Sequence, residues 1–183
     1  MSDVLPEIGP LLAEDRLNAL GPGSPNLAVR SQLQQLESLI APKIRDRNFV
    51  LACLAGLWLN HDFFDESHAI SQDLDTSEGS YWHAILHRRE PDYWNSKYWF
   101  RRCPRHPIFD DLCKDAKVLT EQAGTPAGCE FVTRQKAWDP MAFVNLCESA
   151  AGSRGKVEQL CREIQRCEWR LLFGHCHERA FTV

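Results

Sequence analysis

The sequence predicts an all-α protein, a single-domain bundle of about seven helices around one long buried helix over residues 46–72. Three observations lead to this prediction. Apolar residues recur at helical spacing, as at Leu33, Leu36 and Ile40. Residues 49–59 are apolar on every side, which is typical of a central helix. No segment alternates apolar and polar residues over the length of a strand.

The chain divides into an N-terminal arm and one helical domain. Residues 1–26 are rich in Pro and Gly, so we expect an arm with at most one short helix near residues 11–20. Residues 27–183 are long enough to bury a core without disulfides or a metal. In chain order, we expect helices over residues 27–40, 46–72, 78–90, 91–102, 109–116, 140–151 and 156–179.

Local signals set several of these bounds. A side chain within residues 75–77 can cap the helix that starts near residue 78. Pro91 suits the first turn of the next helix. Asp139 and Pro140 form a cap followed by a first-turn proline. Residues 120–137 lack a clear period, so we expect a loop or one short strand there.

Composition indicates an ordinary globular protein of a reducing compartment. The chain has 44% hydrophobic and 25% charged residues and a net charge of −4. Its eight cysteines include no C-x2-C pair, and the N-terminus lacks the pattern of a signal peptide. The longest apolar run, residues 49–59, is too short to cross a bilayer. We therefore expect a cytoplasmic protein with free thiols and no membrane partner.

Residues 60–106 carry most of the distinctive chemistry. They contain five of the seven histidines, and no Lys or Arg occurs from Asn48 to His87. On a single helix, His61, Asp65 and His68 would share a face within an arc of about 100°. This acidic, histidine-bearing stretch is the first half of a predicted polar site.

The second half lies on the next predicted helix. His83, His87 and Glu90 share one face within an arc of about 60°. Because the turn between the two helices is short, we expect them to be antiparallel neighbours whose polar faces meet. The predicted catalytic residues are His61, Asp65, His68 and Glu90, and the predicted metal ligands are His61, His68, His83 and His87.

Imidazoles one turn apart on a helix can share one divalent ion, with Zn, Fe, Mn and Ni as the candidates. Two alternatives stay open at this point. A histidine–carboxylate pair can act as a general base without a metal. The same side chains can also form a purely structural polar network.

A basic, aromatic stretch follows the histidines. Its predicted substrate-binding residues are Arg88, Arg89, Tyr93, Asn95 and Lys97, which offer hydrogen-bond donors to an anion. The alternative is that the two arginines only complement the C-terminal dipole of their helix. We expect a small anionic partner rather than nucleic acid, because no extended basic track exists elsewhere in the chain.

Two further groups of histidines are weaker candidates. Prolines on both sides of His106 make a rigid loop that could carry this residue toward the main site. His175 and His177 fall near the end of the last helix, where a cationic residue suits the dipole.

The sequence thus favours an enzyme that carries out hydrolysis or proton transfer on a small anionic substrate. The alternative is a non-catalytic binding or interaction protein, and the sequence leaves an oligomer open. Convergence of His61, His68, His83 and His87 on one point would favour the enzyme. Separate bonds from each ring to a carbonyl or carboxylate would favour the alternative.

Overall fold

The computed structural model describes residues 4–181 and confirms the all-α fold. Within these residues the only β-type pairing is one antiparallel bridge between Ile44 and Phe181. The α-helices are α1 (Arg30–Ile40), α2 (Arg47–Asn60), α3 (Phe64–Asp73), α4 (Ser77–Arg89), α5 (Tyr93–Phe100), α6 (Phe109–Gln122), α7 (Glu130–Arg134), α8 (Pro140–Ala150) and α9 (Lys156–Ala180). Short 3-10 turns cover Gly9–Leu12, Leu27–Val29 and Ala41–Lys43.

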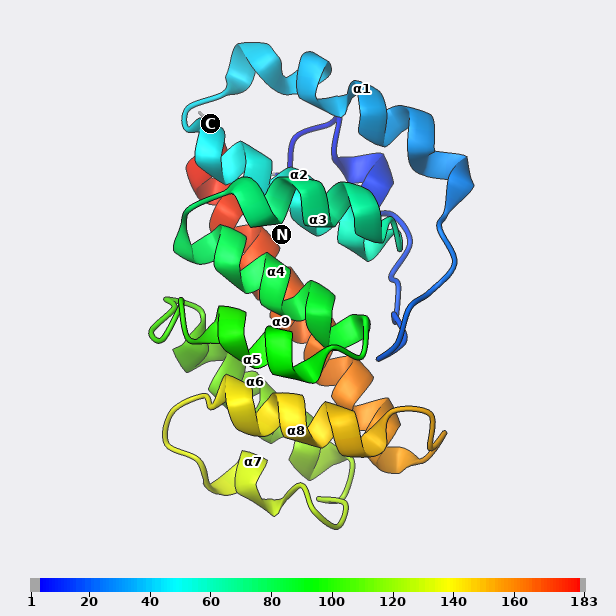
Figure 1. Ribbon diagram of the computed structural model, residues 1–183, viewed down its shortest axis with the longest axis vertical. Coiled ribbons are helices and arrows are strands. Elements are labelled where there is room, and N and C mark those ends of the chain that lie inside the picture. The colour runs from blue at the N-terminus through cyan, green and yellow to red at the C-terminus, as the bar shows by residue number, and fades with distance from the viewer. Residues whose placement is uncertain (1–3, 182–183) are drawn as a thin grey trace.

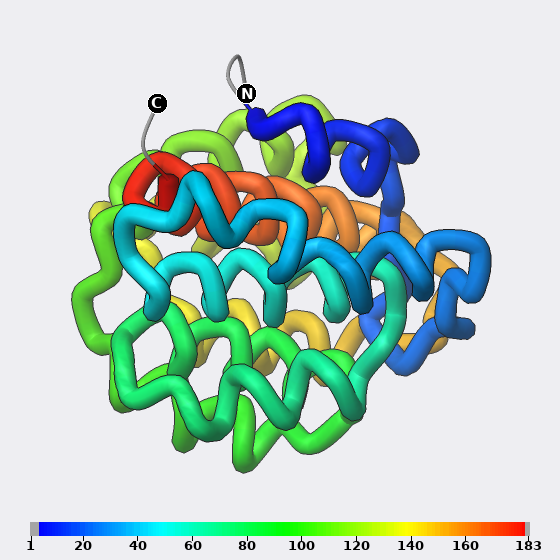
Figure 2. Tube along the Cα trace, turned by 90° about the horizontal axis from the view of Figure 1, so that it is seen from above, coloured from blue at the N-terminus to red at the C-terminus, as the bar shows by residue number. Residues whose placement is uncertain are grey.

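The helices stack from one end of the molecule to the other. Helix α1 crosses one end, and α7 and α8 lie at the opposite end (Figure 1). Between them, α4 packs against α2, α3 and α5, and α9 packs against α2, α6 and α8. The N-terminal segment runs along α9 on the outside of the bundle (Figure 2). None of the helices described over residues 4–181 combines the length and apolar character needed to cross a membrane.

The core forms where α2, α4 and α9 meet. Gly56 on α2 lies so close to Trp82 of α4 that a Cβ atom there would be 2.6 Å from the indole ring. The carbonyl of the same glycine accepts a hydrogen bond of 2.8 Å from Trp169 Nε1 on α9. A side chain at position 56 would therefore separate the three helices, because packed cores leave no room for an added methyl group.

The structure corrects the prediction of a single helix over residues 46–72. Helix α2 ends at Asn60, and α3 begins at Phe64 after a corner at residues 61–63. Asp62 adopts a positive φ of 63°, a left-handed conformation that Asp tolerates better than most residues and that breaks a helix. The chain then turns back, so α3 packs against α2 rather than extending it.

Residues 120–137 also differ from the expectation. Helix α6 continues to Gln122, well past residue 116, because Leu112, Ala116 and Thr120 keep its buried face in register. The predicted loop or short strand then contains the short helix α7, which buries Val132. The predicted caps are present, since Thr76 accepts a hydrogen bond from Gly79 in α4 and Asp139 accepts hydrogen bonds from the first turn of α8. Pro91 is not in the first turn of its helix as predicted, because α5 begins at Tyr93 after its cap, Asp92.

The N-terminal segment is tied to the bundle by packing and by charge. Ile8, Leu11 and Leu20 are buried in the core. Asp15 forms ion pairs with Arg166 and Arg170 of α9, at 3.0 and 2.6 Å. In place of the short helix expected near residues 11–20, the structure has a 3-10 turn over Gly9–Leu12.

Two buried ion pairs hold the last turn of α4. Arg88 binds Glu168 of α9 at 2.5 Å, and neither side chain is exposed to solvent. Tyr81 donates a hydrogen bond of 3.0 Å to the same carboxylate, and the Arg88 guanidinium lies 4.8 Å from the Phe143 ring centre. Arg89 binds Asp62 at the corner between α2 and α3.

Breaking the first pair is expected to destabilise the fold strongly. Glu168→Gln leaves the Arg88 charge buried without its counter-ion, so the free energy of unfolding should fall by roughly 3–5 kcal/mol. Urea denaturation measures this change. Glu178→Gln, on an exposed part of the same helix, is the control and should change stability by less than about 0.5 kcal/mol. A loss below about 1 kcal/mol in Glu168→Gln would contradict the account.

Candidate functional site

Three of the four predicted metal ligands come together between α3 and α4. His68 of α3 and His83 and His87 of α4 each offer a ring nitrogen, and these three atoms lie within 4.8 Å of one another. The ring centres of His68 and His83 are 4.5 Å apart, as are those of His83 and His87. The prediction that α3 and α4 meet through their histidines is therefore confirmed for this trio.

The trio is buried on one side and reachable on the other. His83 and His87 are almost fully buried, whereas His68 is half-buried. The Trp99 ring of α5 covers His83, with 4.2 Å between ring centres. A ligand would therefore approach from the side of His68 rather than through the core.

Neighbouring polar groups orient two of the rings. Ser71 Oγ lies 2.9 Å from His83 Nδ1, so the Nε2 atom of His83 is left for another partner. Asn95 Nδ2 lies 3.0 Å from His87 Nε2. The Glu90 carboxylate lies 3.0 Å from His87 Nδ1, but its approach does not form a hydrogen bond. Such partners fix ring orientation in metal sites.

The environment keeps His83 uncharged. Burial lowers its pKa to about 3, and the neighbouring imidazoles of His87 and His68 act in the same direction. A neutral imidazole has a free lone pair, which is the form that binds a metal or accepts a proton. The site is thus set up to receive a cation rather than to hold a charge of its own.

The structure corrects the placement of His61. The corner at residues 61–63 turns this side chain away from the trio and toward the N-terminal segment. There its Nε2 lies 2.9 Å from the carbonyl oxygen of Leu11, and its Nδ1 lies 3.3 Å from Asn26 Nδ2. His61 thus joins the N-terminal segment to the corner. The same break leaves Asp65 exposed at the start of α3.

The predicted anion-binding residues are divided between two environments. Arg88 and Arg89 are buried in the ion pairs of the last turn of α4, so neither extends toward the histidine trio. Asn95 contacts the trio. Tyr93 is half-buried against the core, and Lys97 is partly exposed with its Nζ atom 3.4 Å from Glu148.

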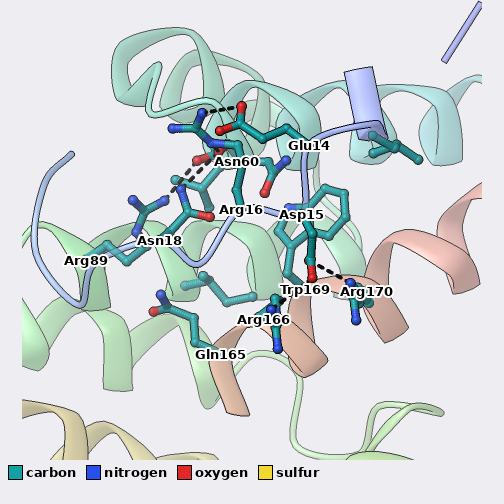
Figure 3. Close-up of a pocket in the computed structure, with 13 residues that line it drawn as sticks. Glu14, Asp15, Arg16, Asn18, Asn60, Arg89, Gln165, Arg166, Trp169 and Arg170 are labelled. Carbon is teal, nitrogen blue, oxygen red and sulfur yellow. Dashed lines mark hydrogen bonds and ion pairs between the residues drawn. The ribbon is translucent and has the colours of Figure 1, made fainter. Parts of the chain in front are cut away.

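A cavity lies on the other face of α4, between the N-terminal segment and α9 (Figure 3). Arg89 lines it together with Asn18, Asn60, Gln165 and Trp169. Residues two apart on a helix point in roughly opposite directions, so the cavity does not open onto His87. No local sequence pattern predicts this cavity, because the residues that line it are far apart in the chain.

A second cluster was not predicted from the sequence. Glu78 in the first turn of α4, His106 in the loop after α5 and His175 near the end of α9 place their ligand atoms within 4.8 Å of one another. The prediction that its loop could carry His106 toward the main site is wrong, because the His106 ring lies beside that of His175. No local spacing links residues so far apart, so no sequence signal could have revealed the cluster.

Comparison with protein families, with curated proteins and with solved structures finds no match for this chain.

Acid should destabilise the metal-free protein through His83. The fold keeps this imidazole neutral down to about pH 3, whereas the unfolded chain takes up a proton near pH 6.5. The stabilisation that comes from this difference is therefore fully present above about pH 6.5 and is lost as the pH falls below 6.5. Between pH 7.5 and 5.0 His83 should lower the free energy of unfolding by roughly 1–2 kcal/mol.

Urea denaturation in EDTA at both pH values measures this effect. His83→Gln should show a smaller loss of stability on acidification than the native protein. An equal loss in both proteins would show that His83 does not titrate in this way.

Proposed function

We propose that the protein is a metal-dependent enzyme that uses His68, His83 and His87 to hold one divalent ion and hydrolyses a small anionic substrate. The observation that carries this proposal is the convergence of three ring nitrogens from two helices on one point. Catalytic zinc sites commonly have three protein ligands and leave one position for water or substrate. The half-buried His68 provides the open side that such a site needs.

The chemistry of the ligands is compatible with Zn, Fe, Mn or Ni, since imidazole binds each of these ions. A bound ion of this kind supplies Lewis-acid activation of water and of a substrate oxygen. The low pKa of His83 means that no proton has to be displaced from this ring near neutral pH. Ser71 and Asn95 keep the rings of His83 and His87 from rotating freely.

Glu90 is the residue that we assign to proton transfer. Its side chain is 34% exposed and lies beside His87, so it meets both the trio and the solvent. Of the two predicted carboxylates, Asp65 is exposed and has no such contact with the trio. A carboxylate in this position can take a proton from water during hydrolysis.

Few cationic side chains remain to bind the anionic group of a substrate. Arg88 and Arg89 are neutralised by their own carboxylates. Lys97 lies two residues from Asn95, so it points to the opposite side of α5, where its Nζ atom approaches Glu148. Trp94 and Tyr98 are exposed on the same helix, and their rings stack with 6.3 Å between centres. We assign a small substrate to the side of the trio next to α5, with Asn95 as its donor.

The alternative function is a non-catalytic binding or interaction protein. It is favoured by His61 and the two arginines, which form structural contacts of the kind that this alternative predicts. It is disfavoured by the trio, whose rings converge rather than each binding a separate carbonyl.

All eight cysteines are free thiols, which supports the cytoplasm as the compartment.

Metal analysis tests the ligands directly. The His83→Ala/His87→Ala double variant should lose one equivalent of bound metal relative to the native protein, because two of three ligands are gone. His177→Ala is the matched control, since His177 lies outside both clusters, and it should keep its metal. Elemental mass spectrometry on untagged protein gives the result. Equal metal content in the double variant and the native protein would show that these histidines do not bind the metal.

Activity of Glu90→Gln tests the catalytic part. With a panel of small phosphate and carboxylate esters and metal-loaded protein, this variant should lose about 10²- to 10⁴-fold in kcat. Asp65→Asn is the control and should retain near-native activity. Hydrolysis by the native protein that Glu90→Gln leaves unchanged would contradict the role of Glu90. Absence of hydrolysis in metal-loaded native protein across the panel would favour the non-catalytic alternative.

A further inference from the structure

We infer that Glu78, His106 and His175 form a second metal site, which takes a zinc-like divalent ion and joins three separate parts of the fold. This inference does not depend on the proposed function, because it concerns different residues on a different face of α4. Glu78 lies about 140–180° around the helix axis from His83 and His87.

The distances between the ligand atoms suit a tetrahedral ion. Glu78 Oε1 lies 3.3 Å from His175 Nε2 and 3.6 Å from His106 Nε2. Two ligands of a tetrahedral zinc ion, each bonded at about 2.0–2.1 Å, are separated by about 3.3 Å. Both distances are longer than a charged hydrogen bond, which is usually about 2.7–2.9 Å. The three side chains are thus spaced more like ligands than like a relaxed hydrogen-bonded network.

One ligand atom lacks any partner in the described structure. The His106 side chain is fully buried, and its Nε2 atom makes no hydrogen bond although Glu78 is nearby. Buried polar atoms without a partner are uncommon and call for an explanation. An ion between Glu78 and His106 would provide that partner.

The surroundings are largely buried and aromatic. The His106 ring packs against Tyr81, with 5.0 Å between ring centres, and the His175 ring packs edge-on to Phe49 at 6.0 Å. The Glu78 side chain is only 14% exposed. These enclosed surroundings leave little room for a substrate beside the ion, whereas the trio has a half-buried histidine at its edge.

The charge of the site also suits a cation. The Glu78 carboxylate faces the rings of His106 and His175, and among the described residues no Lys or Arg forms an ion pair with it. A largely buried carboxylate in this position offers negative charge that a divalent ion would compensate.

The position of the site explains what an ion would do there. Glu78 starts α4, His106 belongs to the loop between α5 and α6, and His175 is near the end of α9. An ion bound by all three would tie a long loop and the last helix to the centre of the bundle. Binding to the folded state alone raises the stability by mass action, so zinc should raise the melting temperature.

The experiment uses full-length protein stripped with EDTA and titrated with Zn²⁺. The His83→Ala/His87→Ala variant removes the first site and should still bind one equivalent of zinc with a rise in Tm. Adding Glu78→Gln should abolish both the binding and the rise in Tm. His177→Ala in the same background is the control and should behave like its parent. Full zinc binding after Glu78→Gln would overturn the inference.

A second measurement covers the case in which Glu78→Gln fails to fold. Co²⁺ added to the stripped His83→Ala/His87→Ala variant should give the intense visible absorption of a four-coordinate site, and Zn²⁺ should displace it. Weak absorption identical to that of Co²⁺ in buffer would overturn the inference. Because the first site is absent from this variant, the result is separate from the outcome for the proposed enzyme.

Discussion

The rotation of α4 about its own axis is fixed by two buried guanidinium–carboxylate pairs at its last turn. Arg88 is held by Glu168 on α9, and Arg89 is held by Asp62 at the corner between α2 and α3. Consecutive residues on a helix are 100° apart, so fixing these two side chains fixes the direction of every other one. His83 and His87 are thereby directed toward α3. The two pairs need good geometry and added hydrogen bonds to offset the loss of hydration.

The same interaction explains the corner that separates α2 from α3. Asp62 is bound by Arg89 and also by Arg16 of the N-terminal segment, at 2.9 Å. These contacts support its left-handed backbone conformation, which a free chain would adopt less often. The turn that results brings α3 back against α2 and places His68 opposite the histidines of α4. One buried aspartate thus connects the N-terminal segment, the corner and the candidate site.

Much of the fold could be predicted from the sequence, because helices depend on the local periodicity of apolar residues. The caps at Thr76 and Asp139 and the helical spacing of apolar residues gave the right class and most of the elements. The break at Asp62 was missed because residues 49–72 keep a helical pattern across it. Only the tertiary contact with Arg89 shows why the helix stops.

Part of the candidate site could be predicted from the sequence for the same reason. His83 and His87 are one turn apart on a real helix, and a short connection brings α3 beside α4, so their meeting with His68 followed from local rules. His61 was placed wrongly, because its direction depended on a helix that is broken at the next residue. Arg88 was interpreted from its charge alone, whereas its partner Glu168 lies 80 residues away. Long-range pairing of this kind leaves no local signal.

The most direct test of the central claim is an anomalous diffraction map of crystals of the metal-loaded protein, recorded at the absorption edge of the ion. The account predicts a peak within bonding distance, about 2.0–2.3 Å, of ring nitrogens of His68, His83 and His87 together. A map in which the three rings are well ordered but share no peak, from protein shown to contain metal, would contradict it.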